Sequence, residues 1–154
     1  MIDSDLVVDF LNTLDVEDGI DLLDDDRAWT GWLGEHGLPG PEGQPRRHRS
    51  RARTLRDDLR RVAEGEQGEV REFRLTLTIA DRKPRLGGTD PLEEILGAVA
   101  RLGVLGELGR VKICPADDCR WAFYDTSRNG SRQWCSMAVC GNRAKARAHR
   151  ARQA

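Results

Sequence analysis

The sequence predicts an α+β fold: a helix-rich N-terminal domain with a small β element, followed by a short C-terminal unit that contains every cysteine. Three observations support this fold class. Apolar residues recur at helical spacing over much of residues 1–109, one stretch alternates apolar and polar residues, and the four cysteines all lie within residues 114–140. With 154 residues, 38% hydrophobic and 33% charged, the chain can build one modest core and one small unit. We therefore expect two domains, residues 1–109 and residues 110–154.

Four helices are expected in the first domain. Residues 4–14 carry the first apolar repeat, and a short helix with two tryptophans ends at Gly37. The third runs over residues 49–63, after the breaker-rich linker "GLPGPEGQP". The fourth has the clearest start, with Asp90 as the cap, Pro91 at the first position and Glu93 completing a capping box.

The pattern of residues 49–63 also predicts which face of that helix is buried. Its apolar stripe is Leu55, Leu59 and Val62, while Arg53, Arg56 and Arg60 line the opposite face. Residues 73–79 alternate apolar and polar side chains, which predicts a half-buried strand. The following "KPRL" could supply a short partner strand.

Four cysteines form two pairs with the pattern C-x4-C, fifteen residues, C-x4-C. Two closely spaced pairs are typical of structural zinc sites, where each chain turn donates two thiolates to a tetrahedral ion. Two disulfides or four unrelated thiols are the alternatives. Disulfides need an oxidising compartment, but the opening "MIDSDLVVDF" has neither the basic start nor the apolar run of a secretory signal. No membrane span is expected, and a reduced, cytoplasmic protein is favoured. The predicted Zn2+ ligands are Cys114, Cys119, Cys135 and Cys140.

Between the two pairs, Asn129-Gly130 is a dipeptide typical of tight hairpin turns, because both residues tolerate positive φ. The expected order is a knuckle, then a β-hairpin, then a helix with the last cysteine near its first turn. That order is the treble-clef-like arrangement of zinc fingers.

The residues 114–152 resemble the CGNR zinc-finger family, named for the tetrad that stands here at residues 140–143. The motifs that carry the resemblance are "CPADDC", "FYD" and "SRNGSRQWCSMAVCGNRAKAR". In that family the finger follows an N-terminal module called ABATE, and "VVDFLNTLD" is similar to the opening of that module. The resemblance implies a zinc-dependent, DNA-binding transcription regulator that responds to stress, with the N-terminal module in a sensory or regulatory role.

Charge is distributed very unevenly along the chain, although the whole has a net charge of −1. Residues 1–45 carry twelve acids and one base, a net charge of −11, and residues 46–154 carry a net charge of +10. Residues 110–154 alone have ten bases and three acids, a net charge of +7. Zn2+ with four thiolates lowers this to about +5, which still favours a polyanionic partner such as double-stranded DNA.

The basic C-terminal helix supplies most of the predicted DNA contacts. Arg143, Arg147 and Arg150 share one face at i, i+4 and i+7 spacing, and guanidinium groups reach phosphates or guanine edges. For Asn142 we favour a helix cap over a base contact. The predicted DNA-binding residues are Arg128, Arg132, Asn142, Arg143, Lys145, Arg147 and Arg150.

The sequence also bears on other functions. No phosphate-binding glycine loop or H-E-x-x-H motif occurs, and zinc held by four thiolates has no open position for water, so no enzyme activity is expected. A zinc-stabilised protein-interaction module is the rival, with Trp121 and Trp134 as anchors. The acidic residues 15–26 are most simply a solvated loop with helix caps, but could bind a cation or mask the finger. Asn12 and Thr13 could touch a small ligand or need no function. The sequence leaves the target DNA, the signal and the oligomeric state open.

Overall fold

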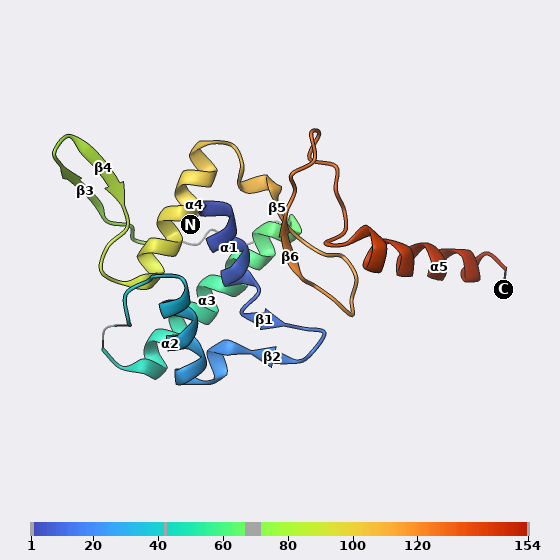
Figure 1. The fold of residues 1–154 in the computed structure, drawn as a ribbon, viewed down its shortest axis with the longest axis horizontal. Coiled ribbons are helices and arrows are strands. Elements are labelled where there is room, and N and C mark those ends of the chain that lie inside the picture. Colours follow the sequence, from blue (N-terminus) through green and yellow to red (C-terminus); the bar gives the residue numbers. More distant parts are fainter. Residues whose placement is uncertain (1, 42, 67–71, 154) are drawn as a thin grey trace.

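The computed structural model describes residues 2–41, 43–66 and 72–153, and its helices surround one main apolar core. The α+β fold class is confirmed. The core helices are α1 (Asp3–Leu11), α2 (Asp26–Glu35), α3 (Pro45–Glu64) and α4 (Pro91–Val104), while α5 (Asn142–Ala151) projects from the body (Figure 1). The strands form three antiparallel pairs, β1 (Leu14–Asp15) with β2 (Ile20–Asp21), β3 (Leu77–Ala80) with β4 (Lys83–Leu86), and β5 (Val111–Ile113) with β6 (Ala122–Tyr124).

All four predicted helices of the first domain are present. The fourth begins as expected, because the Asp90 side chain accepts a hydrogen bond from Leu92 N and Pro91 occupies the first turn. The first is shorter than predicted, since α1 ends at Leu11 and Leu14 lies in β1. In the part of the chain that the structure describes, every helix is too short or too polar to cross a membrane.

The core is centred on aromatic side chains of α1 and α2. Phe10 is fully buried, and its ring centroid lies 6.2 Å from that of Trp29 and 6.0 Å from that of Trp32. The two tryptophan rings stack with 5.2 Å between centroids. Ile95 of α4 and Leu55 of α3 are also buried in this cluster, so all four helices contribute to it.

In α3, burial does not follow the division into an apolar stripe and an arginine face. Arg56 and Arg60 are buried, with exposed fractions of 2% and 7%, whereas the apolar Val62 is 55% exposed. Arg56 donates two hydrogen bonds to the Asp21 carboxylate, at 2.6 and 2.9 Å, and Arg60 donates to Leu11 O at 2.9 Å. Arginines are tolerated inside because each guanidinium meets fixed acceptors that offset its lost hydration.

The acidic residues 15–26 are therefore mostly structural. Asp21 pairs with Arg56, Asp24 with Arg53 at 2.7 Å, and the Asp25 side chain caps α2 by accepting from Arg27 N and Ala28 N. Burial raises the pKa of Asp21, but hydrogen bonds from Arg56 and from Leu23 N hold that pKa below its ordinary value. The cluster is neither a plain solvated loop nor, among the described residues, a group placed to hold a metal ion.

The strand predicted at residues 73–79 is shorter and more exposed than expected. It runs from Leu77 to Ala80, and all of its side chains are exposed. Its predicted partner "KPRL" is confirmed as β4, with Leu77 opposite Leu86 and Ile79 opposite Pro84. The apolar side chains of β3 are exposed because the β3–β4 hairpin projects from the body, so no second layer covers this strand (Figure 1).

The hairpin β5–β6 joins the N-terminal helices to the cysteine unit. Val111, Ile113 and Ala122 are buried in the main core, while Cys114 and Phe123 belong to a second cluster around the cysteines. Asn12 extends this hairpin through its side chain, which donates to Ala122 O at 3.0 Å and accepts from Ala122 N at 2.8 Å. The polar residue at the end of α1 thus has a clear structural role.

Replacing Asn12 with Ala should destabilise the protein by about 1–3 kcal/mol, because the Ala122 N–H and carbonyl would lose their partner in a partly buried position. Chemical denaturation of both proteins measures this difference. Asn129→Ala, at an exposed loop residue, is the matched control and should stay within about 0.5 kcal/mol of the parent. Equal losses in the two variants would contradict the assigned role of Asn12.

Candidate metal centre and basic helix

The first cysteine pair flanks a knuckle between β5 and β6. Cys114 follows Ile113 at the end of β5, and its N–H donates to Trp121 O at 2.8 Å, which closes the loop. Inside the loop, Cys119 N and Arg120 N both donate to Ala116 O at 3.0 Å. Arg120 has φ of 56°, the left-handed conformation that turns the chain back into β6. Both thiols consequently point to the same side of the hairpin.

The second pair lies where the chain enters the C-terminal helix. Cys140 sits in a π-helical turn, Met137–Gly141, which continues directly into α5. Ser136 caps this turn, since its side chain accepts a hydrogen bond from Val139 N at 3.3 Å. The prediction that the last cysteine lies near the first helical turn is confirmed, and Cys135 precedes the cap by one residue.

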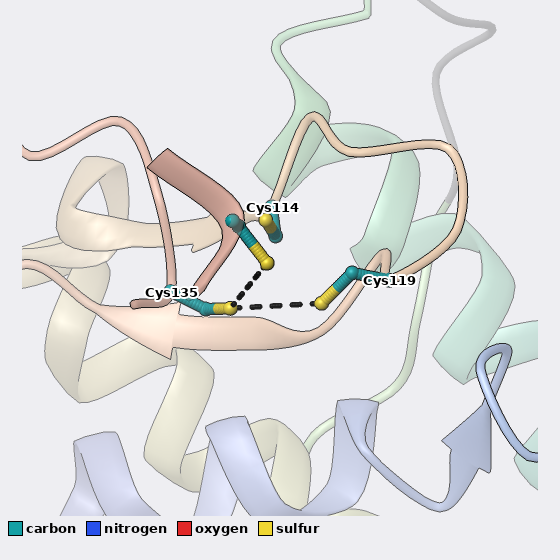
Figure 2. Close-up of side chains that lie close together, drawn as sticks. Cys114, Cys119 and Cys135 are labelled. Carbon is teal, nitrogen blue, oxygen red and sulfur yellow. Dashed lines mark hydrogen bonds between the residues drawn. The ribbon is translucent and has the colours of Figure 1, made fainter. Parts of the chain in front are cut away.

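The four sulfur atoms converge on one point. All of them lie within 4.8 Å of one another, and the Cys135 sulfur is 3.6 Å from that of Cys119 and 3.7 Å from that of Cys140. Figure 2 shows the thiols of the labelled cysteines turned toward a common centre. An ion about 2.3 Å from each of four tetrahedral sulfurs needs sulfur–sulfur distances of about 3.8 Å, so the cluster fits a four-thiolate metal site. A disulfide requires about 2 Å, and these cysteines are free thiols.

The surroundings of the thiols also favour a bound cation. Three of the four cysteines are at most 6% exposed, and Cys135 is half-buried. Burial raises the pKa of Cys140 to about 11 and, together with the neighbouring thiols, raises the pKa of Cys135 further. At Cys114, hydrogen bonds from Cys135 N and Ala116 N outweigh burial and lower the pKa. Four crowded thiolates repel one another, and a shared divalent cation removes that repulsion.

The prediction of a β-hairpin with its turn at Asn129-Gly130 is wrong. The β-hairpin of this unit is β5–β6, which encloses the first cysteine pair, and residues 125–134 form a loop without strands. Gly130 does adopt positive φ, at 60°, but within a turn of that loop. The prediction of a turn at Gly130 is confirmed, whereas the prediction that strands flank this turn is wrong.

A buried carboxylate explains why the loop needs no partner strand. Asp125 is fully buried and accepts hydrogen bonds from Lys112 Nζ at 2.7 Å, Ser127 Oγ at 2.6 Å and Arg132 N at 2.9 Å. Burial alone raises the pKa of Asp125, but these donors hold it well below its ordinary value. Lys112 Nζ also donates to Gly130 O at 2.6 Å. Side chains therefore satisfy backbone groups that a β-ladder would otherwise bind.

The two loop arginines have different environments. Arg132 donates from Nε to Trp134 O at 2.9 Å and from its terminal nitrogen to Cys135 O, and its guanidinium carbon lies 4.9 Å from the centroid of the Phe123 ring. It thereby holds the backbone at Cys135, one of the four clustered cysteines. Arg128 is exposed, and the described residues offer it no ion pair.

In the tetrad, Asn142 does not cap a helix as predicted. The helix already begins at Met137, so Asn142 lies inside it, and its N–H bonds Met137 O, five residues back. Its side chain donates to Ala138 O at 3.1 Å instead of accepting a backbone N–H. The wider π-helical turn shifts the backbone bonding, and the Asn142 amide binds one of the carbonyl groups affected.

The cationic face of α5 begins against acidic neighbours. Arg143 lies 3.2 Å from the Asp118 carboxylate in the knuckle and 3.3 Å from the Glu17 carboxylate in the β1–β2 turn. Arg147 approaches Asp118 at 3.9 Å. Lys145 and Arg150 are exposed and have no ion pair among the residues that the structure describes. The predicted arginine face is present, and Arg143 at its start contacts acids of both the knuckle and the β1–β2 turn.

Sequence reasoning missed three residues that organise this region. Asp125 stood in the quoted motif "FYD" without an assigned role, Glu17 was one of many acids, and Asn12 was a polar residue at a helix end. Glu17 and Asn12 act on distant segments, since Glu17 is 126 residues from Arg143 and Asn12 is 110 residues from Ala122, whereas Asp125 orders the loop that follows it. An invariant asparagine or aspartate among relatives would be the signal that could reveal such contacts.

Comparison with known families gives two matches. Residues 4–117 match the ABATE family, described as "Putative stress-induced transcription regulator", and residues 110–153 match the CGNR zinc finger. The two matches overlap at residues 110–117, the segment that contains β5 and Cys114. The comparison with curated proteins finds no match.

Proposed function

Because the chain belongs to the ABATE family and ends in a CGNR zinc finger, we propose that it is a zinc-dependent, DNA-binding transcription regulator. In this proposal the four cysteines hold Zn2+, the finger and α5 contact double-stranded DNA, and the N-terminal helices carry the regulatory input. Neither family description names an enzyme activity, and the description of the ABATE family as a transcription regulator supports a regulatory role.

The observation that carries the proposal is the position of the cysteine cluster at the base of α5. Cys140 lies in the turn that continues directly into the helix, so a bound ion fixes the start of α5 and its direction. Every residue of α5 is at least partly exposed, and a helix of ten residues is unstable in water without such an anchor. The zinc site thus supports a short cationic helix that no apolar core holds.

The charge of this unit suits a nucleic acid. Residues 110–154 have a net charge of +7, or about +5 once Zn2+ and four thiolates are included. Positive charge on a small projecting element attracts the phosphate backbone over a distance set by the salt concentration. Lys145 and Arg150 are already exposed for this contact, and Arg143 and Arg147 would exchange their acidic partners for phosphates.

Among the loop residues we assign different roles to the two arginines. Arg128 is proposed as the phosphate contact, because it is exposed and without an ion pair among the described residues. Arg132 is proposed to act by holding the loop segment that carries Cys135. Asn142 contributes indirectly, through its bond to the turn that carries Cys140.

A protein-interaction module is the second candidate, and one groove favours it. The groove lies between α1 and β6, has a volume of about 800 Å³, and includes Trp121 and Phe123 with Asp5 and Asp9 opposite. Trp121 is 38% exposed, which is high for a large aromatic side chain. The same groove is a candidate place for a small-molecule or protein signal. Salt separates the candidates, because DNA binding weakens steeply as salt rises and an apolar contact does not.

The purified, reduced protein should contain one Zn2+ per chain, measured by elemental analysis of freshly prepared protein. Cys140→Ser should lose the metal and unfold the C-terminal unit, while most of the helical circular dichroism remains, because Phe10, Trp29 and Ile95 form a separate core. Ser131→Ala, in an exposed loop position, is the control and should retain zinc. Fresh protein without zinc would contradict the metal assignment.

Replacing Arg143, Arg147 and Arg150 with Gln, with zinc still bound, should weaken binding to genomic DNA fragments at low salt. Each lost phosphate contact should flatten the slope of log affinity against log salt by about one unit. Arg27, Arg46 and Arg47, all exposed in the N-terminal domain, form the control because their replacement with Gln removes the same charge. Undiminished binding by the α5 variant would favour the protein-interaction candidate.

Glu17→Gln should raise DNA affinity a few-fold at low salt, because Arg143 would lose one of the two carboxylates that compete with phosphate. The rise should shrink at high salt, since both partners are exposed and screened. Asp18→Asn makes the same charge change one residue away, at an exposed side chain outside the described ion pairs, and should have little effect. If the two variants bind equally, Glu17 does not mask the finger.

A further inference from the structure

The hairpin β3–β4 projects from the end of the molecule opposite α5 (Figure 1). An isolated two-stranded hairpin is only marginally stable in water, so its two outer edges are important. Gly87 N donates to Thr76 O at 2.9 Å, and bonded pairs alternate along an antiparallel ladder. The N–H and carbonyl groups of Leu77 and Ile79 therefore face away from β4, as do those of β4 residues 84 and 86.

The outer edge of β4 is protected from further pairing. Pro84 lies at an outward position, where it has no N–H to donate. Leu86 O, the next outward group, accepts a hydrogen bond from Arg101 of α4 at 3.2 Å. Lys83 and Arg85 add positive charge to the same strand. Proline, charge and a covering helix are the usual means of blocking an edge strand.

The outer edge of β3 has none of these features. Residues 75–79 read Leu-Thr-Leu-Thr-Ile, a segment with high β-propensity and no charge or proline. No hydrogen bond joins this edge to another segment within the described ranges. Leu77 is 57% exposed and Ile79 71% exposed, on the same side of the hairpin. This edge has the properties of a strand that accepts a partner strand.

We propose that β3 pairs with β3 of a second copy of this chain, antiparallel and centred on Leu77. The segment is almost palindromic, so this register places Leu77 opposite its own equivalent, Thr76 opposite Thr78, and Leu75 opposite Ile79. Aliphatic side chains then meet on one face and threonines on the other.

The proposed contact is isologous, because both copies contribute the same edge of β3. Each copy uses the open edge of β3 once, which gives a twofold dimer through this contact and no larger assembly. The α5 helices lie at the far ends of the two copies and remain exposed (Figure 1). A contact of about five residues per copy is small, so the dimer should be weak and concentration-dependent. It does not depend on zinc-mediated DNA binding and is measured without DNA.

Sedimentation equilibrium of the full zinc-loaded chain, from low micromolar to near-millimolar concentration, tests the proposal. The parent protein should shift from monomer to dimer, and Leu77→Glu should remain monomeric because two carboxylates would face each other at the dyad. Lys83→Glu introduces a carboxylate on the protected strand of the same hairpin and should still dimerise. A parent protein that stays monomeric, or that forms larger assemblies, overturns the proposal.

A charge-swap pair separates strand pairing from simple misfolding of the hairpin. Leu77→Glu and Leu77→Lys should each be monomeric, whereas their equimolar mixture should form dimers, because Glu and Lys would then be opposite each other. A variant that dimerises as well as the parent places the interface elsewhere. Monomeric variants that the mixture does not rescue overturn the register centred on Leu77.

Discussion

The pairing of β5 with β6 is the interaction on which the rest of this structure depends. One part of the hairpin contributes Val111, Ile113 and Ala122 to the core formed by the helices, and its connecting knuckle carries Cys114 and Cys119. Asn12 adds two hydrogen bonds to the edge of β6. Because a single short hairpin serves both clusters, the position of the metal site is fixed relative to α1, and the two family matches overlap at this segment.

Buried charge is the second organising feature. Arg56 and Arg60 of α3 lie in the interior, and Asp21, Leu11 O and Arg120 O act as their acceptors. Arg60 thus reaches both the end of α1 and the knuckle, so α3 contacts the cysteine unit through a guanidinium group. Removing one partner of such a contact is costly, because the other charge remains buried without compensation.

The C-terminal unit combines a rigid base and an exposed helix. Asp125 and Lys112 order the loop between the cysteine pairs, and Arg132 holds the backbone of Cys135. From this base α5 extends into solvent with its cations, and among the residues that the structure describes only Arg143 and Arg147 have acidic ion-pair partners. A fixed base and a free cationic helix suit binding to an extended polyanion, since few internal contacts must be broken before the helix meets its partner.

The sequence by itself determined the features that depend on local spacing. Cysteine spacing predicted the four-sulfur cluster, Asp90 and Pro91 predicted the start of α4, and the apolar repeats predicted the helices. Tertiary structure alone decided the features that depend on distant partners. Arg56 is buried because it binds Asp21, which is 35 residues away in sequence. Asn12 binds the backbone of Ala122 in β6, which is 110 residues away. Tertiary structure also paired β5 with β6 in place of a hairpin at Asn129-Gly130, because Asp125 and Lys112 satisfy the loop with side chains. Local patterns record which residues can be buried or turned, whereas the acceptor that each charged or polar group finds is set by the packed chain.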